Sequence, residues 1–117
     1  MKFFRKREIP GESYDWGYEI WWGNVPSLYL GKTLVVYKNK VLPLHYHERK
    51  YETIYCESGI GKVTVIEPDG TVSKFTMGPG QAIELPPMTQ HRIVAHGCEL
   101  LLFESSTYEP EDSIILE

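Results

Sequence analysis

Apolar and polar residues alternate over short segments of this chain, and no window holds the spacing of an amphipathic helix. Residues 62–66 read Lys-Val-Thr-Val-Ile and are followed by the turn signal Glu67-Pro68-Asp69-Gly70. The alternation returns over residues 71–76, so the pattern predicts a β-hairpin over residues 62–76. β-branched and aromatic side chains predict further strands at residues 33–37, 53–56, 82–85, 92–95 and 99–104.

These predicted strands are separated by glycine and proline, of which the chain has 10 and 8. Several short strands with no helical segment between them are typical of an antiparallel β-barrel or β-sandwich. The sequence therefore predicts an all-β fold, and its length of 117 residues predicts one domain over residues 1–117. Residues 1–12 and 106–117 are polar with few strand signals, and we expect them to form arms or sheet edges.

Composition excludes several classes of protein. The net charge of -4 argues against general nucleic-acid binding, because neutralising phosphates needs a basic excess. No apolar run approaches the roughly 20 residues of a membrane-spanning helix. The basic residues 2–7 are not followed by an apolar segment, so we expect no signal peptide. The 2 cysteines are too few for a disulfide framework, and we expect a reducing, cytoplasmic location.

Histidine spacing supplies the candidate chemistry. His45 and His47 are two residues apart, so on a strand both side chains point to the same face. Glu52 has the wrong offset for that face of a continuous strand, but the charged segment 48–50 predicts a bend that lets Glu52 face inward from the next strand. His91 opens another predicted strand, on which it shares a face with Ile93.

Three imidazoles and one carboxylate suit a divalent transition metal: iron, manganese, zinc, nickel or cobalt. Four protein ligands on an octahedral ion leave two positions for water or substrate, as Lewis-acid or oxygen-activating chemistry requires. A His-x-His pair alone is as often a structural pair of histidines. The addition of Glu52 and His91 favours a metal site made of His45, His47, Glu52 and His91.

The same residues carry a family resemblance. His45-Tyr46-His47, four residues, Glu52, six residues and Gly59 resemble the first motif of the cupin superfamily, and Gly80, five residues, Pro86 and then His91 resemble the second. Asn39 and Met88 stand where those motifs usually have glycine, and Ala95 stands where the second often has asparagine. The resemblance implies a jelly-roll β-barrel, the double-stranded β-helix of cupins, with the metal inside.

A narrower resemblance extends over nearly the whole chain, to the cupins of type II mannose-6-phosphate isomerases. It is carried by Trp16-Gly17-Tyr18-Glu19, Lys32-Thr33-Leu34-Val35-Val36, Ser58-Gly59 with the following strand, His91-Arg92-Ile93 and the tail from Glu104 to Ile115. That group often has glutamine where this chain has His45. The resemblance implies a sugar-phosphate isomerase in which Lys32 and Arg92 bind the substrate, holding its phosphate or stabilising the enediolate. Lys32 also fits a solvated strand edge, and Arg92, which strand alternation points away from His91, also fits a structural ion pair.

Three functions remain open at this point. The chain is expected to be an aldose–ketose isomerase acting on a sugar or sugar phosphate, an iron-dependent oxygenase or lyase acting on a small molecule, or a non-catalytic binding module. The sequence names no clear general base for the isomerisation. Aromatic residues at Trp16, Trp21 and Trp22 and the flat sheets of cupins favour a homodimer.

Overall fold

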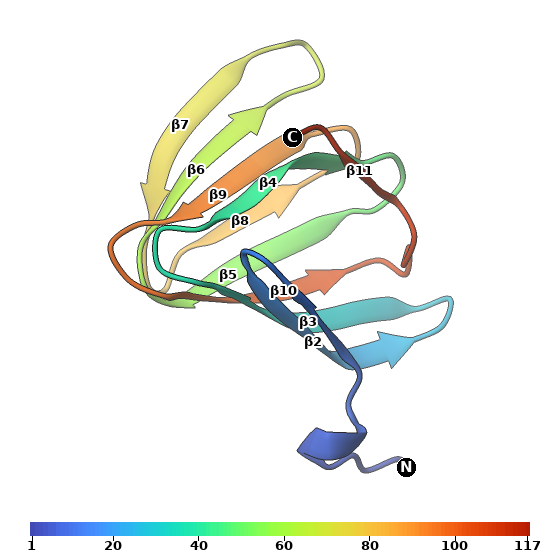
Figure 1. Cartoon of the computed structure of the whole chain (residues 1–117). Coiled ribbons are helices and arrows are strands. Elements are labelled where there is room, and N and C mark those ends of the chain that lie inside the picture. The colour runs from blue at the N-terminus through green and yellow to red at the C-terminus, as the bar shows by residue number, and fades with distance from the viewer.

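Two antiparallel β-sheets and one short 3-10 helix, η1 (Lys6–Glu8), make up the structure, a computed structural model that describes residues 1–117 (Figure 1). The six-stranded sheet has the order β1 (Gly11–Tyr14), β2 (Gly17–Val25), β3 (Tyr29–Val36), β10 (Leu100–Ser106), β5 (Glu52–Ser58) and β8 (Ala82–Leu85). The five-stranded sheet has the order β11 (Ser113–Ile115), β4 (Val41–His47), β9 (Gln90–Ala95), β6 (Gly61–Ile66) and β7 (Val72–Met77). The prediction of an all-β fold is confirmed.

The core lies between the sheets because successive side chains of each strand point to opposite faces. Val63 and Val65 on β6 are buried, and the residues that alternate with them are not. On β9, Ile93 pairs with Val63, and His91 pairs with Val65. The buried cluster continues onto the other sheet through Ile54, Leu102 and their neighbours. The last apolar layer therefore lies directly beside the histidines.

The predicted hairpin is present as β6 and β7, joined by the turn at residues 67–71. The Oδ1 atom of Asp69 accepts a hydrogen bond from the Thr71 amide at 2.9 Å, and Gly70 adopts a φ of 91°. An Asp side chain that caps the amide two residues later and a glycine with positive φ are what this turn chemistry requires. The remaining predicted strands are also present, most of them longer by one or more residues.

Both ends of the chain supply sheet edges. β1 pairs only with β2, and β11 pairs only with β4, so each is the edge strand of its sheet. In Figure 1 the segment before β1, with η1, extends away from the two sheets. The chain forms no helix with the length and apolar character that crossing a lipid bilayer requires.

Candidate metal centre

Three strands bring four ligand side chains to one point between the sheets. β4 supplies His45 and His47, β5 begins with Glu52, and β9 supplies His91. His45 and His91 are direct partners across the β4–β9 ladder. One ligand atom from each of the four residues lies within 4.8 Å of those of the others. The bend at residues 48–51 separates β4 from β5, so Glu52 faces inward as predicted.

Backbone carbonyl groups orient all three imidazole rings through their Nδ1 atoms. His45 donates to Pro43 at 2.7 Å, His47 donates to Asp112 at 3.0 Å, and His91 donates to Thr89 at 3.3 Å. A proton held on Nδ1 leaves the lone pair of Nε2 free for a metal, and such outer partners fix the tautomer of metal-binding histidines in proteins.

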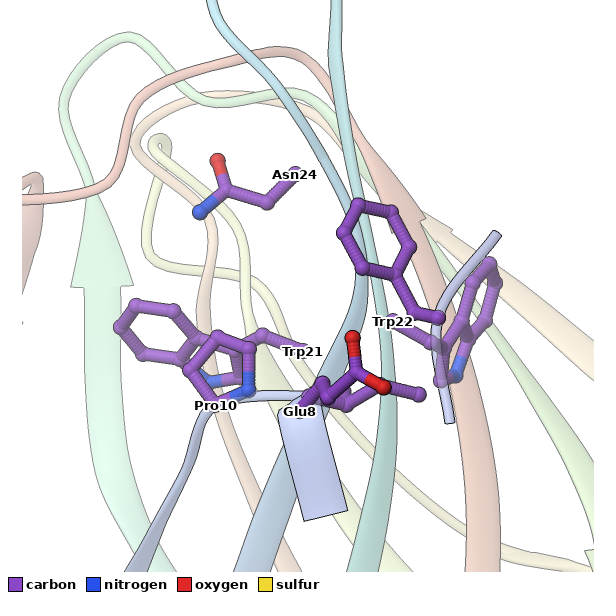
Figure 2. A pocket seen from close by; sticks show the side chains of 7 residues that line it. Glu8, Pro10, Trp21, Trp22 and Asn24 are labelled. Atoms are coloured by element: carbon purple, nitrogen blue, oxygen red, sulfur yellow. The ribbon is translucent and has the colours of Figure 1, made fainter. Parts of the chain in front are cut away.

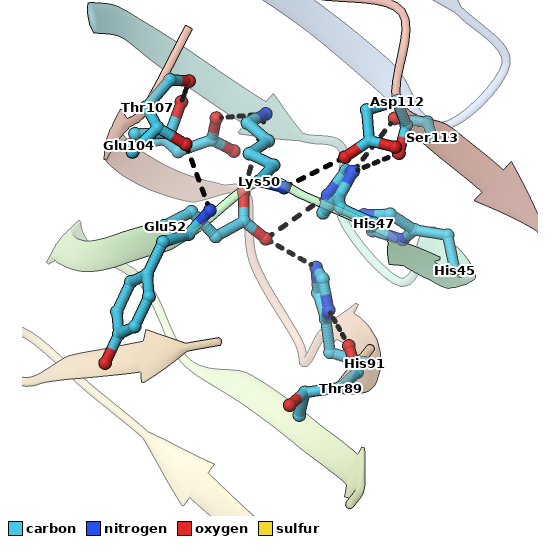
Figure 3. A network of polar contacts seen from close by, with 12 residues as sticks. His45, His47, Lys50, Glu52, Thr89, His91, Glu104, Thr107, Asp112 and Ser113 are labelled. Carbon is cyan, nitrogen blue, oxygen red and sulfur yellow. Dashed lines mark hydrogen bonds and ion pairs between the residues drawn. The ribbon is translucent and has the colours of Figure 1, made fainter. Parts of the chain in front are cut away.

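Glu52 is buried at the centre of this arrangement. Its Oε1 atom lies 3.0 Å from Nε2 of His91 and 3.4 Å from Nε2 of His47, and Figure 3 shows the carboxylate between the two rings. Both carboxylate oxygens and Nε2 of His91 are buried without a hydrogen-bond partner. With the ring protons on Nδ1, these atoms are acceptors that face acceptors, which is costly unless a cation lies among them. The donor set therefore fits a divalent ion.

The local electrostatics keep two of the ligands, His45 and Glu52, in their metal-binding forms. Burial and the neighbouring His91 lower the pKa of His45 from 6.5 to about 3, so its ring stays neutral. Burial alone would raise the pKa of Glu52, but the close approach of the His47 and His91 rings and the charge of Lys50 outweigh it and hold that pKa well below its usual value. Neutral imidazoles and an ionised carboxylate are the forms that bind metals.

A network of charged side chains adjoins Glu52, and the sequence did not predict it. Nζ of Lys50 lies 3.6 Å from Oε2 of Glu52 and 2.9 Å from Oε2 of Glu104. The charges of Glu104 and Glu52 outweigh burial and raise the pKa of Lys50, so it remains an ammonium. The available signal for Glu104 was its place on the inward face of β10, two residues after the buried Leu102 and four after the buried Leu100.

The two residues expected to bind substrate lie in different places. Lys32 belongs to this charged network. Its Nζ atom lies 3.8 Å from Oε2 of Glu104 and 3.5 Å from Oε1 of Glu19. Arg92 follows the inward-facing His91, and its Nε lies 3.0 Å from a carboxylate oxygen of Glu117. The structure therefore brings Lys32 to the network beside the centre and pairs Arg92 with the C-terminal residue.

A cavity of about 160 Å3 is lined by His45, the one candidate ligand that it reaches. The stacked rings of Tyr14 and Trp16, with centroids 4.7 Å apart, form its wall on the side of the β1–β2 hairpin. The remaining lining residues are Glu19, Leu42, Pro43, Ser113 and Ile115. A smaller cavity shares Ser113 with this one and is lined by Lys32 and Lys50.

A further hollow lies between the N-terminal segment and β2, with none of the four ligands in its lining. Figure 2 shows Pro10 and Glu8 facing Trp21, Trp22 and Asn24 across it. Its volume is about 210 Å3. It lacks the metal-ligand set, so the chemistry belongs to the cavity beside His45.

A family model for the cupin domain matches residues 33–104, which contain all four candidate ligands. The chain belongs to the cupin family. It is a metal-binding cupin whose ligand set suits a divalent transition metal. No curated protein matches the chain.

Solved structures share this cupin's fold over almost its whole length. Oxalate decarboxylase from Bacillus subtilis superimposes with a TM-score of 0.86 at 16% identity, covering 97% of this chain and 31% of the decarboxylase. The Lactobacillus farciminis oxalate decarboxylase in complex with formate superimposes with a TM-score of 0.83 at 19% identity, covering 97% and 35%. Another structure of the Bacillus enzyme comes from work on its Mn(II) centres. It superimposes with a TM-score of 0.85 at 16% identity, covering 97% of this chain and 32% of the decarboxylase. This cupin therefore spans about a third of those chains, and the likeness establishes the fold.

The cupin fold also explains two departures from the family motifs. Asn39 and Met88, which occupy positions usually held by glycine, have φ angles of 60° and 68°. This left-handed region favours glycine, and asparagine tolerates it better than methionine does. Both residues thus adopt the left-handed backbone conformation that glycine would adopt without strain, and methionine is the more strained of the two.

Proposed function

We propose that this cupin is a metal-dependent lyase that removes carbon dioxide from a small carboxylic acid. In the reaction, the bond from carbon to the carboxylate breaks, carbon dioxide leaves, and a proton takes its place on the carbon. A bound divalent cation would supply Lewis acidity, holding substrate oxygen and stabilising the negative charge that develops.

The observation that carries the proposal is the set of unpartnered acceptors next to His45, which itself lines a small cavity. Both oxygens of Glu52 and Nε2 of His91 lack hydrogen-bond partners, and His45 lines the cavity. A cavity of about 160 Å3 admits a small acid. Its walls are mostly apolar and aromatic, which leaves His45 as a metal-binding group at the edge of an apolar surface.

Charge also favours an anionic substrate. The buried Lys50, Glu52 and Glu104 are joined by the partly buried Lys32 and Glu19, so the network holds two lysines and three glutamates. A divalent ion reverses that acidic excess, so the occupied centre attracts a carboxylate. Lys32 lines the small cavity beside Lys50, so its charge adds to the field around the centre while its ammonium group stays paired with Glu19 and Glu104.

The fold of the oxalate decarboxylases gives independent support, because those enzymes act on a small dicarboxylic acid and the work on the Bacillus enzyme concerns Mn(II) centres. Manganese is therefore the metal to load first.

The isomerase implied by the narrower resemblance requires a cationic site for a phosphate. Lys32 is engaged by two carboxylates, and Arg92 is paired with Glu117. Neither cation is free for a phosphate, so we place aldose–ketose isomerisation second to the lyase.

The test is a substrate panel with manganese-loaded protein. Oxalate and small 2-oxo and 2-hydroxy acids would be assayed for carbon dioxide release, and mannose 6-phosphate for conversion to fructose 6-phosphate. The proposal expects carbon dioxide from one of the acids, and loss of that activity in Glu52→Gln. Fructose 6-phosphate formation, or a ligand-dependent rise in Tm with no product from any acid, would contradict it.

A further inference from the structure

Asp112 lies just before β11 and binds the turn that connects His47 to Glu52. Its carboxylate accepts hydrogen bonds from the backbone amides of Glu48, Arg49 and Lys50, at 3.2, 2.7 and 2.9 Å. The side chain is buried, and these amides outweigh the effect of burial and lower its pKa. A carboxylate that accepts several backbone amides fixes the conformation of that segment.

The same residue also orients a metal ligand through its main chain. The carbonyl oxygen of Asp112 accepts the Nδ1 proton of His47 at 3.0 Å, and Oγ of Ser113 lies 3.4 Å from the same nitrogen. Ser113 is the β-ladder partner of His47 (Figure 3). One residue therefore holds both the ring of His47 and the turn that leads to Glu52.

We propose that Asp112 is a positioning residue for the metal centre and that it couples the docking of β11 to metal affinity. It lies outside the residues 33–104 that match the cupin family model. Because the segment from Asp112 to Ile115 must be docked for His47 to be oriented, releasing that segment lowers metal affinity. By linkage, binding of the metal stabilises the docked segment to the same extent.

The first test compares the affinity of purified variants for Co²⁺ by competition with a chromophoric chelator. Asp112→Asn keeps the shape but replaces one acceptor oxygen with a donor, so at least one backbone amide loses its partner. Loss of an outer-shell partner typically weakens metal binding by about 10–100-fold, and we expect the Kd to rise by at least about tenfold.

Two variants serve as matched controls. Asp69→Asn removes a carboxylate that caps a backbone amide in the exposed β6–β7 turn. Glu48→Gln removes an exposed negative charge from the same turn that Asp112 holds. We expect both to stay within about twofold of the native Kd, because neither orients a ligand. A native Kd in Asp112→Asn, or an equal loss in Glu48→Gln, overturns the proposal.

A second measurement uses the native protein and stays decisive even where Asp112→Asn does not fold. Amide hydrogen exchange is followed with and without Co²⁺. The proposal expects the metal to slow exchange at residues 48–50 and 113–115 at least about tenfold more than at Thr71, whose amide is held by Asp69. Equal slowing at the two sites, or none at residues 113–115, overturns it.

Discussion

At the scale of single residues, the metal centre depends on buried charged side chains, in which Lys50 neutralises both Glu52 and Glu104. Glu52, Lys50 and Glu104 are each about 5% exposed or less. Such groups stabilise the fold only while their partners are present, because an isolated buried charge is costly. The network therefore fixes which substitutions the centre tolerates.

The first prediction concerns Lys50. Lys50→Met leaves Glu52 without a cation and leaves Glu104 with only Lys32, at 3.8 Å, and we expect the free energy of unfolding of the metal-free protein to fall by about 3–5 kcal/mol. Adding Glu104→Gln removes the repulsion between Glu104 and the unpaired Glu52, so the double variant should recover part of that loss. Urea unfolding measures both. A loss below about 1 kcal/mol in Lys50→Met would contradict the buried network.

The second prediction concerns pH. The pKa of His45 is about 3 in the folded protein against a usual 6.5, so between these values the unfolded chain binds more protons. The free energy of unfolding of the metal-free protein should therefore decrease as the pH falls below 6.5, with His45 contributing up to about 1.4 kcal/mol per pH unit. Urea unfolding at several pH values should show a shallower slope in His45→Asn. An unchanged slope would refute the role of His45.

The sequence could predict the four ligands because their signal is local. His45 and His47 are two residues apart on one strand and so share a face, and His91 lies near the start of another strand. Lys50, Glu104 and Asp112 gave no such signal, because each acts across the fold: Lys50 binds Glu104 and Asp112, which are 54 and 62 residues away. Pairings of that kind depend on sheet register, which one sequence does not reveal.

At the scale of elements, strand interiors and the local pairing of the β6–β7 hairpin were predictable, and the pairing of strands far apart in the sequence was not. Alternation and turn residues located β6 and β7, since a two-residue period and an Asp-Gly turn are local properties. β11 has three residues and pairs with β4 only after the chain has returned around the barrel. Its position, on which the orientation of His47 depends, follows from tertiary packing.

The third prediction concerns the turn that links β5 to β6. Gly59 has a φ of 90°, and a Cβ atom there would lie 2.4 Å from the carbonyl oxygen of Glu99. Gly59→Ala should therefore lower the free energy of unfolding by at least about 3 kcal/mol, combining backbone strain with a steric clash.

Gly70 provides the matched control for this substitution. Its φ is 91°, but nothing lies within 4 Å of a Cβ atom built there. Gly70→Ala should cost only the backbone strain, about 1–2 kcal/mol. Equal losses of stability in the two variants would show that the close approach to Glu99 has no effect.

At the scale of the whole molecule, exposed aromatic residues favour the dimer that the sequence predicts. Phe4, Trp22 and Tyr29 are 54%, 48% and 49% exposed. All three line a second hollow, next to the one in Figure 2, between the N-terminal segment and the turn that joins β2 to β3. Apolar surface concentrated in this way is typical of interaction sites. The homodimer expected from the sequence would cover this surface, and a mass measurement tests that expectation.

The fourth prediction is the solution mass. Light scattering should give twice the chain mass of 13.5 kDa. Phe4→Glu should shift the protein toward the single-chain mass, because it places a charge in the contact. Val72→Glu, at an exposed position on β7, should leave the mass unchanged. A native mass of one chain would rule out the dimer.

The central claim is that three imidazoles and a carboxylate from separate strands hold one metal ion, and elemental analysis tests it most directly. Purified native protein incubated with Mn²⁺ and desalted should retain about one ion per chain. His47→Ala should retain little of it, while His96→Ala, which changes the exposed histidine outside the cluster, should match the native protein. Native protein without bound metal, or His47→Ala with a full complement, would contradict the account.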